Sequence, residues 1–141
     1  MSLIVDIADA LATALNGKEF SMEFEAARDY RPVLELQDMK TLRVSVVPKG
    51  VTMAPADRSR VQHEVEVDVL VQKKLEAGDA TELDALMSLV EEIAGFLKFK
   101  RLESAGALWL KTANDPIFAP DHIDQFRQFT SVLTVTYRVV R

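Results

Sequence analysis

The chain has 141 residues, of which 48% are hydrophobic and 28% are charged, and its formal net charge is −5 at pH 7. This size and balance are typical of one folded domain, and no basic cluster is present to follow a phosphate backbone, which disfavours sequence-specific nucleic-acid binding. Cysteine is absent, which excludes disulfides and thiolate metal sites. No apolar run approaches the roughly 18 residues needed to cross a bilayer, so no membrane partner is expected.

The first part of the chain predicts a helix followed by a short strand. Apolar residues recur at steps of three and four over residues 4–15, the pattern of an amphipathic helix. Ser2 is expected to cap its start, and Asn16-Gly17 to supply a left-handed residue at its end. Residues 20–24 alternate apolar with polar side chains and predict a strand. The stretch from Tyr30 to Lys40, interrupted by Pro32, is expected to be a loop or an irregular edge.

Two further alternating segments predict strands separated by a long loop. Residues 42–46 alternate apolar and polar side chains up to Pro48. Residues 61–71 form the clearest strand pattern in the chain, with valines and His63 at alternate positions. The intervening residues 48–60 are expected to form a loop longer than a hairpin needs.

The charge pattern predicts how these two strands pair. In an antiparallel hairpin, paired residue numbers must sum to an odd value if both apolar sets are to face one side. A register of this kind places Arg43 opposite Glu64 or Glu66, a favourable cross-strand pair. The sequence therefore predicts a hairpin with that register.

The second half of the chain predicts another helix and two strands. Asp79 and Glu82 have capping-box spacing before the amphipathic residues 83–97, and the basic residues 98–101 suit a helix end. A short strand is expected over residues 107–111, one helical turn over 121–125, and a long strand over 129–139. The expected fold is therefore α+β, a single mostly antiparallel β-sheet with two amphipathic helices packed on one face, in one domain over residues 1–141.

Few residues suggest chemistry. His63 lies on the valine face of a predicted strand, which favours a core-edge histidine with a local hydrogen bond. Asp121, His122 and Asp124 could suggest a metal or hydrolase site, but residues so close in sequence rarely converge on one ion. Glu91 and Glu92 point about 100° apart on a helix and are expected to be solvated. We therefore expect no catalytic residue, no metal and no cofactor.

Two surface features favour contacts with a partner. The predicted loop carries Lys49, Arg58 and Arg60, and long ordered loops are often functional, although a flexible insertion would fit equally well. The outward side of the long strands carries Leu70, Val132 and Val140 among charges. Several apolar residues on one exposed face would suggest a subunit contact.

The order of these elements resembles the tail terminator and minor tail (tail completion) proteins of long-tailed bacteriophages. The resemblance runs from the helix at residues 4–15 through the segment Tyr30-Arg31-Pro32-Val33-Leu34-Glu35-Leu36 to the closing strand Phe129-Thr130-Ser131-Val132-Leu133-Thr134-Val135-Thr136-Tyr137. No invariant chemical motif accompanies it.

The resemblance implies a structural virion protein and not an enzyme. It implies a homo-oligomeric ring, commonly a hexamer, that caps the tail tube and joins it to the head. The implied partners are other copies of the chain, the tail tube protein and the head-completion protein, and the implied location is the virion tail, after assembly in the host cytoplasm. Two alternatives stay open: another head-tail connector or minor tail component, and a non-phage α+β binding or adaptor domain.

Overall fold

The computed structural model describes residues 2–30, 42–76, 79–118, 120, 123 and 127–141. The elements follow in the order α1 (Leu3–Asn16), β1 (Glu25–Arg28), β2 (Arg43–Pro55), β3 (Val61–Lys74), α2 (Ala80–Leu97), the 3-10 turn η2 (Glu103–Ala105), β4 (Leu108–Asn114) and β5 (Gln128–Val140). Within these residues the strands form one sheet in the order β1-β2-β3-β5-β4. The pairing of β1 with β2 is parallel and the others are antiparallel. The expected α+β fold with a mostly antiparallel sheet is confirmed.

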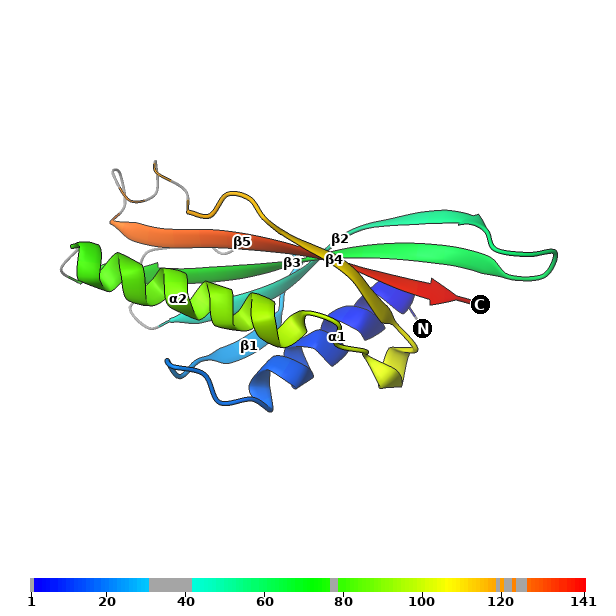
Figure 1. Ribbon diagram of the computed structural model, residues 1–141, viewed down its shortest axis with the longest axis horizontal. Helices are drawn as coiled ribbons and strands as arrows, with labels where there is room; N and C mark the ends of the chain where they lie inside the picture. The colour runs from blue at the N-terminus through cyan, green and yellow to red at the C-terminus, as the bar shows by residue number, and fades with distance from the viewer. Residues whose placement is uncertain (1, 31–41, 77–78, 119, 121–122, 124–126) are drawn as a thin grey trace.

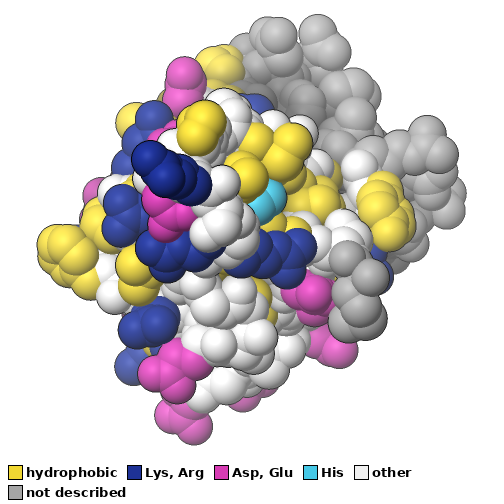
Figure 2. All heavy atoms as spheres, turned by 90° about the vertical axis from the view of Figure 1, so that its right-hand side faces the viewer, with side chains coloured by type: hydrophobic (Ala, Val, Ile, Leu, Met, Phe, Trp, Pro, Cys, Tyr) yellow, Lys and Arg dark blue, Asp and Glu magenta, His cyan; other side chains and the backbone are white. Residues whose placement is uncertain are grey.

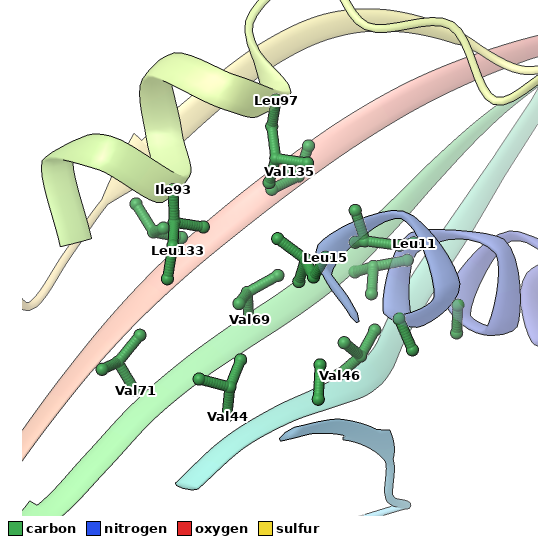
Figure 3. Packing of buried hydrophobic residues seen from close by; sticks show 14 of the residues in the cluster. Leu11, Leu15, Val44, Val46, Val69, Val71, Ile93, Leu97, Leu133 and Val135 are labelled. Carbon is green, nitrogen blue, oxygen red and sulfur yellow. The ribbon is translucent and has the colours of Figure 1, made fainter. Parts of the chain in front are cut away.

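Both helices cover the same face of the sheet (Figure 1). Leu11 and Leu15 of α1 and Ile93 and Leu97 of α2 point toward the valines of the sheet (Figure 3), and all four side chains are at most 1% exposed. The sheet residues in this core are alternate positions of its central strands: Val65, Val67, Val69 and Val71 of β3, and Leu133, Val135, Tyr137 and Val139 of β5. Period-two alternation in the sequence therefore located the buried face.

The predicted helix caps are present at both N-termini. The Ser2 hydroxyl accepts from the Val5 amide at 3.5 Å, and the Asp79 carboxylate accepts from the Glu82 amide at 3.0 Å. The expectation for Gly17 was wrong, because this residue has a right-handed φ of −85°. Its amide donates to the Thr13 carbonyl at 3.1 Å, so it continues the helical hydrogen bonding instead of reversing the chain.

The strand expected at residues 20–24 lies further along, at Glu25–Arg28. Phe20 stacks on Phe24 with ring centroids 5.3 Å apart and meets the edge of Phe96 at 5.7 Å. These side chains pack together over α2, so their alternation does not reflect sheet faces. The strand that does form is tied to α1 by Asn16, whose side chain donates to the Ala26 carbonyl at 2.9 Å and accepts from the Ala26 amide at 2.7 Å.

The β2–β3 hairpin exists, but its predicted register and loop were wrong. Arg43 lies opposite Gln72, and the guanidinium of Arg43 is instead 3.3 Å from the carboxylate of Asp29. Most of the expected loop at residues 48–60 is strand, since β2 continues to Pro55 and β3 begins at Val61. A β-bulge between Pro48 and Gly50 takes up one extra residue of β2. Because the two strands pair continuously from the turn inward, the turn and the bulge set their register.

The later strands follow their predictions, with differences in exposure. The strands expected at 107–111 and 129–139 correspond to β4 and β5. The far face of the sheet is not one apolar patch, because Leu70 is buried, Val132 is half-buried and Val140 is 38% exposed. The helical turn expected at 121–125 and nearly all of the loop expected between Tyr30 and Lys40 lie outside the described residues.

Candidate functional site

The end of the β2–β3 hairpin projects beyond both helices (Figure 1). We call residues 48–63 the arm. Every residue from Val51 to Val61 is exposed, in contrast to the inner halves of the same strands, where valines are buried. In the arm β2 pairs with β3 from Gly50 with Glu66 to Pro55 with Val61. On its other side β3 pairs with β5 up to Gln62, and Val61 bonds to Arg141, the residue after β5.

A hydrogen-bonded turn fixes the tip of the arm. The Asp57 carboxylate accepts from the backbone amides of Ser59 at 2.9 Å and Arg60 at 2.8 Å, and it pairs with the Arg60 guanidinium at 2.7 Å. These hydrogen bonds, from the Ser59 amide first and then from Arg60, lower the pKa of Asp57 below its usual value. The tip is therefore an ordered structure at neutral pH.

One face of the arm is apolar and uncovered. Val51 is 44% exposed, Met53 is 66% exposed and Val61 is 37% exposed. Their register places them on the same side of the sheet as the buried valines, because Val51 lies opposite Val65 and Met53 opposite His63. Figure 2 looks at this end of the molecule and shows hydrophobic side chains gathered beside a histidine, with lysine and arginine side chains around them. The core-facing side of the sheet thus continues past the helices into solvent.

No strand among the described residues pairs with the outer edge of β2 along the arm. The Val61 amide and carbonyl both bond to Arg141, the residue after β5, and therefore point away from β2. By alternation along the paired strands, the amides and carbonyls of Met53 and Val51 point away from β3. Within the described residues, β1 pairs with β2 only as far as Val46. Unpaired strand edges of this kind can accept another strand.

The predicted contact residues all lie on this arm. Lys49 lies at the bulge at its base, whereas Arg58 and Arg60 lie in the turn at its tip. Arg60 is engaged by Asp57, but Lys49 and Arg58 have no ion-pair partner in the described part of the chain. Whether these three side chains contact a partner stays a prediction.

Sequence reasoning missed the apolar residues of the arm. Val51 and Met53 alternate with Thr52 and Ala54, but they fall between Pro48 and Pro55 and were assigned to a loop. Continuing the alternation of residues 42–46 with one residue skipped for a bulge would have found them.

The histidines were only partly located. His63 is half-buried on the helix-covered side, as expected. Its Nδ1 is buried without a hydrogen-bond partner, so this atom of the ring does not make the expected local bond. Asp121, His122 and Asp124 lie outside the described residues. Among the residues that the structure does describe, no three His, Asp or Glu side chains are placed to hold a metal ion. Glu91 is exposed, and Glu92 is exposed but accepts hydrogen bonds from Ser21.

No protein-family model matches this chain, and no curated protein matches its sequence. In the described part of the chain, neither helix is long and apolar enough to cross a membrane.

Proposed function

We propose that this chain is a structural assembly subunit that binds other copies of itself through the arm, and that it acts by binding and not by catalysis. The observation that carries the proposal is the uncovered apolar face of Val51, Met53 and Val61 on a projecting, ordered ribbon. Apolar surface that continues a core into solvent is typical of a protein interface, and the open β2 edge adds backbone donors and acceptors. Three such side chains buried together supply a compact apolar centre for the contact.

The assembly we propose is a ring of the tail terminator or tail completion type, with six copies as the expected number. What supports this choice is the order of the elements, in which a helix, a β-hairpin, a second helix and a closing long strand resemble that phage family. In this role the ring would cap the tail tube in the virion and bind the tail tube protein and the head-completion protein. A head-tail connector is the nearest alternative, and the identity of neighbouring genes discriminates between the two.

Self-association is tested with one arm variant and a matched control. We expect purified protein to elute in size-exclusion chromatography with light scattering at a multiple of the mass of one chain. Met53→Asp should shift it to one chain, because a carboxylate on the apolar face resists burial. Ala54→Asp is the control, since Ala54 is the next residue, exposed on the opposite face of the same strand. A wild-type protein that stays monomeric at every concentration would contradict the proposal.

The tail role needs a separate measurement. Tail tubes of the same virus, incubated with the protein, should show capped ends by electron microscopy and should stop growing. Met53→Asp should leave the ends bare, whereas Ala54→Asp should cap them. Self-association without any binding to tube ends would agree with the proposed assembly subunit but would refute the terminator role.

A further inference from the structure

A second surface feature is a groove beside α1 and β1. It has a volume of about 970 Å³, and its walls come from the chain between α1 and β1 and from the start of β2. Its apolar lining includes Phe20, Met22 and Phe24, which are half-buried and pack against the core from outside. Its carboxylates are Glu19, Glu23 and Glu25, all exposed. The groove therefore combines apolar contact area with negative charge.

The basic side chains of the groove do not cancel this charge. Arg43 lines the groove but is paired with Asp29 at 3.3 Å, so its charge is already compensated. Lys18 is the other cation in the described lining. Glu19 and Glu23 have no hydrogen-bond or ion-pair partner among the described residues, so both carboxylates are available to an incoming cation.

The arm has the complementary chemistry. Of the 17 lysines and arginines in the chain, five lie in the arm or beside it in residues 138–141, whereas only one of the 22 acidic residues does. The rest of the chain is accordingly more acidic than the net charge of −5 indicates. The arm thus offers an apolar face with basic side chains, and the groove offers apolar side chains with free carboxylates.

The two features lie apart in the fold. In Figure 1 the tip of the arm is at the right-hand end of the long axis, and the chain between α1 and β1 is at the lower left. The base of the arm is fixed in the sheet by the pairing of β3 with β5, so the arm cannot reach the groove of its own chain. A contact between arm and groove must therefore join two copies, and it is head-to-tail, the geometry that closes rings.

From this juxtaposition we infer that the groove lined by Glu19 and Glu23 receives the arm of the next copy, with Lys49 and Arg58 facing those carboxylates. This inference rests on the proposed self-assembly and names the surface that accepts the arm. In this head-to-tail contact each copy gives its arm to one neighbour and its groove to another. The inference therefore excludes a two-fold contact in which two arms pair with each other.

Charge reversal tests the inference directly. Lys49→Glu with Arg58→Glu alters the arm, and Glu19→Lys with Glu23→Lys alters the groove; each variant alone should weaken self-association at least tenfold. Mixing the two variants should restore assembly, because the reversed arm then faces the reversed groove and each native arm faces a native groove. Asp84→Lys with Glu103→Lys makes the same change in net charge on exposed residues elsewhere and should assemble like wild type.

The outcomes separate this inference from the proposed function. A monomeric wild type refutes self-assembly itself. If the wild type assembles and the groove variant assembles equally well, the groove is not the acceptor. The proposal that copies bind through the arm is then retained. Particles in the mixture that contain the two variants in a ratio of one to one, measured by native mass spectrometry, support the inference. Binding of the wild-type arm to anionic vesicles or to DNA, in place of self-association, would overturn it.

Discussion

The connection between α1 and β1 depends on one side chain, that of Asn16. β1 has four residues at the edge of the sheet and pairs with β2 on one side. The backbone groups of Ala26 on its other side are bonded by the Asn16 amide, which donates at 2.9 Å and accepts at 2.7 Å. Asn16→Ala removes both bonds and leaves the amide and carbonyl of Ala26, a buried residue, without these partners.

The expected loss of stability follows from those two bonds. Each hydrogen bond contributes about 1 kcal/mol net, and an unsatisfied buried group raises the cost to about 1–3 kcal/mol. Alanine is a better helix former than asparagine by roughly 0.5 kcal/mol, which offsets part of the loss at Asn16. We therefore expect Asn16→Ala to lower the free energy of unfolding by about 2 kcal/mol. For a chain of this size that lowers Tm by about 4–8 °C.

Urea unfolding followed by circular dichroism measures this change, with an expected decrease in the midpoint of about 1 M. The control is Thr13→Ala, an exposed position in the same helix, which should be neutral or slightly stabilising. Hydrogen exchange should also show faster exchange at the Ala26 amide in Asn16→Ala. A loss below about 0.5 kcal/mol, with unchanged exchange at Ala26, would refute the reasoning.

Three further predictions concern the core and the surface. Ile93→Ala should lower the free energy of unfolding by about 3 kcal/mol in chemical denaturation, because its side chain is fully buried, whereas Glu91→Ala should change it by less than about 0.5 kcal/mol. Burial raises the pKa of Tyr137 above its ordinary 10.0, because the buried site favours the neutral phenol. The stabilisation that this gives is complete below about pH 10 and is lost as the pH rises further. Between about pH 9 and pH 11 the wild type should therefore lose more stability than Tyr137→Phe, and equal losses would contradict this cause. Glu92→Ala should speed hydrogen exchange at the Ser21 amide, which donates to Glu92 at 3.2 Å, and should change global stability by about 1 kcal/mol or less.

The helices and the central strands were predictable because their patterns are local. Ser2 and Asp79 each cap a helix from within three residues, which a sequence shows directly. The alternation of residues 61–71 and 129–139 places one face of β5, and the same face of β3 from Val65 onward, against the helices. Such segments can be predicted without knowing which other segments they pack against.

The course of β2 was not predictable because prolines usually end strands. Pro48 and Pro55 lie at positions whose backbone nitrogen points away from β3, so the missing N–H removes no bond from the ladder. The predicted register rested on a charge pair between Arg43 and either Glu64 or Glu66, but surface ion pairs are too weak to compete with a continuous ladder. Instead, the short turn and the bulge set the register.

The candidate site was located only in part. The basic residues Lys49, Arg58 and Arg60 stood out in the sequence, and all three lie on the arm. The apolar face of Val51 and Met53 was hidden by the assignment to a loop. The groove requires the tertiary packing of Phe20 and Phe24, which share a surface only once α1, β1 and α2 have packed together.

The bulge at Lys49 has a consequence for the shape of an assembly. It absorbs a single surplus residue, so Met53 stays on the helix side while the ribbon gains twist and a bend at the point where it leaves the body. Deleting Lys49 would leave the apolar face of the arm on the helix side of the sheet, but it would change the direction in which the arm leaves the subunit. In the ring proposed above, the curvature would depend on that direction, so deleting Lys49 is expected to change the number of copies that close it.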